Sequence, residues 1–118
     1  MTDKTTLFKK ELSIDLKELL TEMHVAEDVF IRILKISIET TEEDLASLKA
    51  YIEEGNREKA EETSHKLKGV YANMRITPLY KIAADMYSLA RSEQGLSELN
   101  PLLDLFSQNY SKLKAILD

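Results

Sequence analysis

The 118-residue sequence contains no cysteine, only two prolines and only three glycines. The absence of cysteine excludes disulfide bonds, thiol catalysis and cysteine-ligated metal sites, and it fits a reducing compartment. Few glycines and prolines leave too few turn residues for a β-sandwich, whereas Leu, Glu, Lys, Ala and Ile are plentiful. We therefore expect an all-α protein.

Long apolar segments are also missing. The N-terminal sequence MTDKTTLFKK lacks the apolar core of a signal peptide, and no stretch approaches the roughly 20 apolar residues of a membrane span. The length, with 43% hydrophobic and 31% charged residues, suits one hydrophobic core. We expect one soluble, cytoplasmic domain over residues 1–118 that does not bind membranes, with residues 1–13 as a candidate for a separate or loosely ordered N-terminal segment.

One central stretch lacks acidic residues. The net charge of the whole chain is −5, which argues against a general nucleic-acid binder. Residues 63–84 nevertheless contain no Asp or Glu, so that His65 lies in a locally basic segment. The basic residues of this segment are Lys66, Lys68, Arg75 and Lys81. Elsewhere, the acidic cluster Glu42, Glu43 and Asp44 is interpreted as a solvated face.

Apolar residues recur at helical spacing along most of the chain. Residues 5–23 fit one helix or two short ones, and residues 26–54 fit one long helix that Gly55 ends. Asn56 can cap the following helix, because its side-chain oxygen can accept a bond from a free backbone N–H of the first turn. That helix carries His65.

Two further helices are predicted in the second half of the chain. Thr77 is a good N-cap and Pro78 suits the first helical position, where its missing N–H costs nothing. Gly95 should end that helix, and the last one should start near Asn100 and Pro101. Four helices with short connections predict an antiparallel up-and-down four-helix bundle, with the N-terminal segment across one end.

The apolar residues of the helix that carries His65 gather on one face. They are Leu67, Val70, Tyr71 and Met74. His65 therefore points away from the core and should be accessible to solvent. Gly69, one turn further on, costs roughly 0.8–1 kcal/mol of helix propensity relative to alanine, and no packing on the outer face requires it. With Ala72 it leaves room for another molecule to approach the imidazole.

Three more residues complete the predicted docking surface around Gly69 and Ala72. Ile76 should form an apolar rim on the same outer face, and Glu61 and Glu62 should lie there too. A partner protein could dock on this surface.

Lys68 lies three residues after His65, close enough for its ammonium group to reach a group carried by the imidazole. An imidazole with the ordinary pKa of about 6.5 is largely neutral near pH 7 and keeps a lone pair for attack on phosphorus. The pattern therefore predicts a phosphohistidine at His65, stabilised by Lys68. Lys66 either contributes or is a solvated side chain. His24 has no such surroundings, and the two histidines form no local zinc motif.

The segment HKLKGVYANMR resembles the histidine-containing phosphotransfer (HPt) domain family. The family pattern is roughly His, any residue, Leu, Lys, Gly, then small residues and often Asn. The matching residues are His65, Leu67, Lys68, Gly69, Ala72 and Asn73. Met74 stands where the family usually has Leu, Tyr71 where a small residue is common, and Arg75 where a glycine is usual. The likeness extends over about residues 14–118.

This resemblance implies a phosphocarrier with no ATP-binding or kinase activity of its own. It would accept a phosphoryl group on His65 from the aspartate of a response-regulator receiver domain and pass it to another receiver, in a multistep two-component phosphorelay that includes a hybrid sensor histidine kinase. The chain itself needs no metal or cofactor under this interpretation, because the receiver would bring the Mg²⁺. No Walker-type nucleotide motif is present. We expect a monomer.

Three other interpretations remain open. The chain could be the phosphoacceptor domain of a chemotaxis-type kinase, which takes phosphate from an ATP-binding domain. It could be a non-catalytic helical interaction module that binds a receiver or kinase without phosphotransfer. It could also bind nucleic acid through the basic residues of the acid-free segment, which predicts salt-sensitive binding.

Overall fold

A computed structural model describes residues 3–118, so the first two residues of the predicted N-terminal segment lie outside the described part. The all-α prediction is confirmed, since these residues form helices and no strand. None of the described helices is long and apolar enough to cross a membrane. The elements are α1 (Lys4–Leu12), α2 (Leu16–Met23), α3 (Glu27–Glu54), α4 (Arg57–Asn73), α5 (Thr77–Ala90), the short 3₁₀ helix η1 (Leu96–Glu98) and α6 (Leu99–Leu117).

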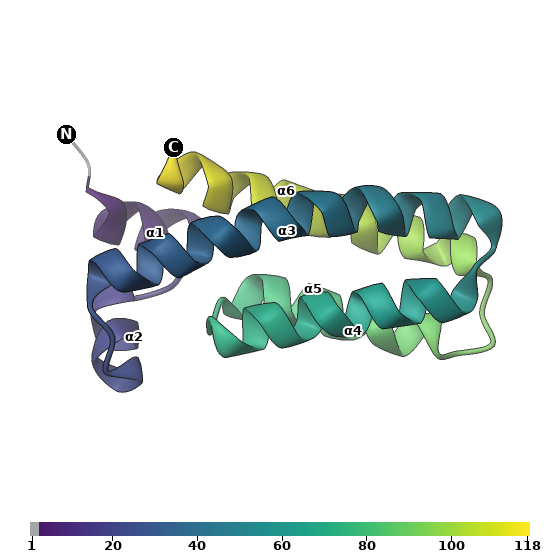
Figure 1. Cartoon of the computed structure of the whole chain (residues 1–118), viewed down its shortest axis with the longest axis horizontal. Coiled ribbons are helices and arrows are strands. Elements are labelled where there is room, and N and C mark those ends of the chain that lie inside the picture. The colour runs from purple at the N-terminus through teal and green to yellow at the C-terminus, as the bar shows by residue number, and fades with distance from the viewer. Residues whose placement is uncertain (1–2) are drawn as a thin grey trace.

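The four longest helices lie lengthwise beside one another. In Figure 1, α3 and α6 lie along one side of the molecule, and α4 and α5 lie along the other. The first turns of α3 extend past the end of α4, and the two short helices α1 and α2 lie at that end. Helix α1 contacts the end of α6, where Lys4 Nζ donates a hydrogen bond to the Ile116 carbonyl at 3.1 Å.

Local sequence determines where the first helices begin and end. Gly55 ends α3 with φ 71°, and Asn56 caps α4, where its Oδ1 accepts a hydrogen bond from the Lys59 N–H at 3.2 Å. Both roles were predicted from the sequence. The N-terminal region forms two short helices, because Ser13 turns the chain at φ 57° and Asp15 caps α2.

The core includes the apolar face of α4 that the helical spacing of the sequence predicted to be buried. Leu67 and Tyr71 are fully buried, and the Tyr71 ring packs edge-on against Phe106 of α6 with centroids 5.7 Å apart. The Tyr71 hydroxyl lies 2.7 Å from Thr41 Oγ1 on α3, which gives this buried phenol a hydrogen-bond partner. Burial raises the pKa of Tyr71 to about 12. Tyr71 is therefore a core residue that ties α4 to α3 and α6.

The predicted end of α5 at Gly95 is wrong, because the helix already ends at Ala90. One arginine side chain, instead of a glycine turn, binds the carbonyl group of the last residue of α5 and two carbonyl groups that follow it. Arg57 Nη1 donates to the carbonyls of Ala90 at 2.7 Å and Ser92 at 2.9 Å, and Arg57 Nη2 donates to that of Gln94. A cation at a helix C-terminus is also favoured by the helix dipole.

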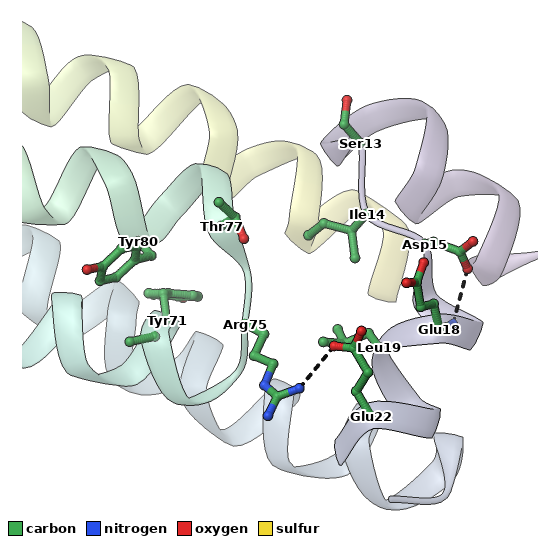
Figure 2. A pocket seen from close by; sticks show the side chains of 11 residues that line it. Ser13, Ile14, Asp15, Glu18, Leu19, Glu22, Tyr71, Arg75, Thr77 and Tyr80 are labelled. Carbon is green, nitrogen blue, oxygen red and sulfur yellow. Dashed lines mark hydrogen bonds and ion pairs between the residues drawn. The ribbon is translucent and has the colours of Figure 1, made fainter. Parts of the chain in front are cut away.

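The turn between α4 and α5 is built around Arg75, which has φ 55°. The Ile76 N–H donates to the Tyr71 carbonyl at 3.0 Å, and the Arg75 N–H donates to the Ala72 carbonyl at 3.1 Å. This pair of bonds is a Schellman motif, whose left-handed position usually holds glycine. Figure 2 shows the Arg75 guanidinium paired with Glu22 of α2, at 3.2 Å. Arg75 thus adopts the left-handed conformation that this motif requires, although it is not a glycine.

The predicted outward position of Ile76 is wrong, since its side chain is fully buried. The prediction extended the helical spacing of α4 to Ile76, but the helix ends at Asn73 and the chain turns at Arg75. Ile76 instead occupies the N-cap position of α5, which begins at Thr77, one residue earlier than predicted.

Replacing Arg75 tests this turn. We expect Arg75→Gly to be more stable than Arg75→Ala by about 1 kcal/mol, because only a side chain with a Cβ is strained in the left-handed region. Both variants lose the exposed ion pair with Glu22, so the comparison isolates the backbone cost. Urea unfolding of the two variants measures the difference. Equal stabilities would mean that residue 75 does not have a positive φ in solution.

Candidate functional site

His65 lies on the outer face of α4 and is exposed, as predicted. Its neighbours Ser64 and Leu67 are fully buried, so the backbone of this turn is held by the core while the imidazole faces solvent. A rigid helix therefore presents a nucleophilic side chain at the surface.

The nearest aromatic neighbour of His65 comes from α5. The ring centroids of His65 and Tyr87 are 5.0 Å apart, with a tilt of 49° between the ring planes. The two rings line a hollow of about 270 Å³ between α4 and α5, together with Glu58, Glu61 and Glu62. The sequence pattern did not indicate Tyr87, because it does not show which side of α5 meets α4.

Two cations lie over the ring of Tyr87. Lys68 Nζ is 5.2 Å from the ring centroid, and Arg91 Cζ is 5.3 Å from it. Both distances fall within the range of cation–π interactions. Arg91 also pairs with Glu61, with 3.7 Å between Nε and Oε1. The structure thus brings Lys68, which the sequence pattern singled out, and Arg91, which it did not, to the same ring as His65.

Lys66 points toward α3, where its Nζ lies 3.2 Å from Asp44 Oδ1. The Asp44 side chain is only 14% exposed, so the interpretation of Asp44 as part of a solvated face is wrong. The packing of α4 against α3 covers this carboxylate, which the sequence alone could not indicate. A role for Lys66 beside a phosphoryl group stays a prediction, and it would require Lys66 to leave Asp44.

The predicted docking residues, apart from the buried Ile76, lie at the surface. Gly69 and Ala72 are exposed, and a Cβ built on Gly69 would meet no atom within 4 Å. Glu62 pairs with Lys59 at 3.3 Å, while Glu61 is the partner of Arg91. The surface beside His65 is therefore open on its C-terminal side and acidic on its N-terminal side.

The acid-free segment is less basic in the folded chain than in the sequence. Asp44 of α3 pairs with Lys66, and Glu22 of α2 pairs with Arg75. Acidic residues far away in sequence thus neutralise two of the four basic side chains. This arrangement weighs against the nucleic-acid interpretation, which needs a continuous positive surface.

A second hollow lies apart from His65. It has a volume of about 480 Å³ and is bordered by α2 and the α4–α5 turn, with Glu18, Glu22, Arg75 and Tyr80 among its lining residues (Figure 2). Within residues 3–118 there is no group of three or more His, Cys, Asp or Glu side chains placed to hold a metal ion.

A comparison with protein-family models matches residues 32–116 to the Hpt domain model. The match covers most of the chain, and we conclude that the chain belongs to the Hpt domain family. This family acts in phosphotransfer-related two-component signalling, in which Hpt domains interact with receiver domains and kinases. Comparisons with curated proteins and with solved structures gave no match. Helices α1 and α2 precede the matched region.

Proposed function

We propose that this protein accepts a phosphoryl group on His65 from the phosphorylated aspartate of a response-regulator receiver domain and passes it to the aspartate of another receiver. It would act as an intermediate in a multistep two-component phosphorelay that begins at a hybrid sensor histidine kinase. The observation that carries this proposal is the exposed imidazole of His65, with Lys68 one turn away and open space over Gly69.

The chemical step needs a nucleophile and charge neutralisation. The lone pair of one His65 ring nitrogen would attack phosphorus, forming an N–P bond while the P–O bond to the aspartate breaks and the carboxylate keeps the electron pair. The proton on the other ring nitrogen would then pass to solvent, and the reverse sequence would deliver the group to the next aspartate. Lys68 and Arg91 can neutralise the phosphoryl oxygens. The receiver would supply the Mg²⁺.

A docking surface would extend from α4 onto α3. Ile33 precedes Asp44 by eleven residues, about three helical turns, so both lie on the same side of α3. The Lys66–Asp44 ion pair indicates that this side borders α4. The exposed apolar side chains in the first turns of α3 are Val29 at 39%, Ile33 at 47% and Ile36 at 61%. Gly69 and Ala72 lie between His65 and the end of α4, so together with these α3 side chains they would offer a receiver an apolar contact area that starts at His65.

The proposal is tested with a set of receiver domains, each phosphorylated on its aspartate. After incubation with this protein, we expect acid-labile phosphate on the chain and, by mass mapping, modification of His65. Absence of transfer from every receiver, or modification at another residue, would contradict the proposal. Binding of a receiver without any transfer would instead support the alternative of a non-catalytic interaction module.

A further inference from the structure

The ring of Tyr87 contacts three groups at the candidate site. It lies 5.0 Å from the His65 ring, 5.2 Å from Lys68 Nζ and 5.3 Å from Arg91 Cζ. His65 and Lys68 are one turn apart on α4, and Arg91 follows Tyr87 by one turn, directly after the last residue of α5. One aromatic side chain therefore joins the imidazole to one cation from α4 and one from the end of α5.

Each of these contacts constrains a group that would otherwise move freely. An exposed imidazole samples several rotamers, and a tilted ring contact favours one of them. Lysine and arginine side chains are also mobile at a surface, and an aromatic face holds them only weakly. A phosphoryl group offers a stronger, charge-assisted hydrogen bond, so it can replace the ring as their partner.

We propose that Tyr87 is a positioning residue for His65. Its ring orients the imidazole and holds Lys68 and Arg91 near the imidazole until these two cations form hydrogen bonds with a phosphoryl group. This proposal rests on the proposed function of His65 as a phosphoacceptor. Tyr87 itself takes no part in the chemical step, and its hydroxyl group is not needed.

Phosphoramidate, a small chemical donor, tests this role without any partner protein. The phosphoryl group moves from the phosphoramidate nitrogen to a ring nitrogen of His65, and ammonia leaves with the displaced imidazole proton as ammonium. The labelling rate of His65 is followed by ³¹P NMR in the wild type, Tyr87→Leu and Tyr87→Phe. Tyr80→Leu is the matched control, since Tyr80 is a half-buried tyrosine two turns earlier on α5.

We expect Tyr87→Leu to label His65 roughly three- to tenfold more slowly, because the nucleophile and the two cations are no longer held together. Tyr87→Phe keeps the ring and should stay within about twofold of the wild type, as should Tyr80→Leu. The ring-proton NMR signals of His65 should shift in Tyr87→Leu, because the ring current of Tyr87 is lost, but not in Tyr80→Leu. Circular dichroism and thermal midpoints verify that each variant is folded.

Three results would overturn the positioning role: equal labelling rates in the wild type and Tyr87→Leu, His65 signals that do not respond to the loss of Tyr87, or no labelling of His65 in the wild type. The two proposals fail separately. If phosphoramidate labels His65 at a rate that depends on Tyr87, but no receiver transfers phosphate to the protein, the relay function is rejected and the positioning role stands. If a receiver transfers phosphate to His65, but neither the transfer nor the labelling rate changes in Tyr87→Leu, the positioning role is rejected and the relay function stands.

Discussion

Replacing His65 with glutamine should abolish phosphotransfer from a receiver while leaving the fold intact. The amide nitrogen of glutamine has no available lone pair, so it cannot form the N–P bond. The side chain is exposed on α4 and glutamine is a good helix former, so we expect the free energy of unfolding to change by less than about 0.5 kcal/mol. Transfer from a radiolabelled receiver and thermal unfolding measure the two effects.

His24 provides the control for this experiment. It is the other histidine of the sequence, exposed at the end of α2 with φ 56°. Asparagine tolerates this left-handed conformation, so His24→Asn should fold and accept phosphate at the wild-type rate. Labelling of His65→Gln at the wild-type level would show that another residue carries the phosphate, and loss of labelling in His24→Asn would make His24 that candidate.

Replacing Arg57 with methionine should produce the largest loss of stability among the changes proposed here. Methionine keeps much of the apolar stem, but the carbonyls of Ala90, Ser92 and Gln94 lose their charged donor. Hydrogen bonds to charged groups contribute more than neutral ones, and we expect a loss of about 2–3 kcal/mol. For a chain of this size, the thermal midpoint should fall by about 10 °C.

Lys59 is the control for Arg57. It belongs to the same first turn of α4, but its side chain is about half exposed and forms a surface ion pair with Glu62. Lys59→Met should therefore change the free energy of unfolding by less than about 0.5 kcal/mol. Arg57→Lys keeps the charge but not the planar set of donors, and its stability should fall between the wild type and Arg57→Met. An Arg57→Met protein as stable as Lys59→Met would mean that water satisfies the end of α5 equally well.

Arg57 also matters for the candidate site. Arg57 is the first residue of α4, and its side chain binds the end of α5, which is close in sequence to Tyr87 and Arg91. This fixes how the two helices are aligned along their length, and hence which side chains of α5 lie beside His65. A stability determinant outside the site thus helps to define its geometry.

Much of the fold could be predicted from local sequence signals. The periodicity of α4 placed His65 outside and Tyr71 inside, and Gly55 and Asn56 marked one turn correctly. These features depend on neighbours within a few residues, which the sequence displays directly. The wrong position of Ile76 arose where a helix was extended past its true end.

The parts of the site that could not be predicted depend on contacts between helices. Tyr87 reaches His65, and Asp44 reaches Lys66, only because α5 and α3 pack against α4 with a particular rotation and alignment. No local pattern encodes that rotation. The end of α5 was missed for the same reason, since Arg57 caps it from another helix.

The empty space around Gly69 has a consequence for engineering. Because an added Cβ would meet no atom of the folded chain, alanine fits there and would gain roughly 0.8–1 kcal/mol of helix propensity. A search for more heat-resistant variants would therefore be expected to choose Gly69→Ala early. That same methyl group would narrow the approach to His65, so selection for thermal resistance alone would work against the nucleophile, and the two properties need to be screened together.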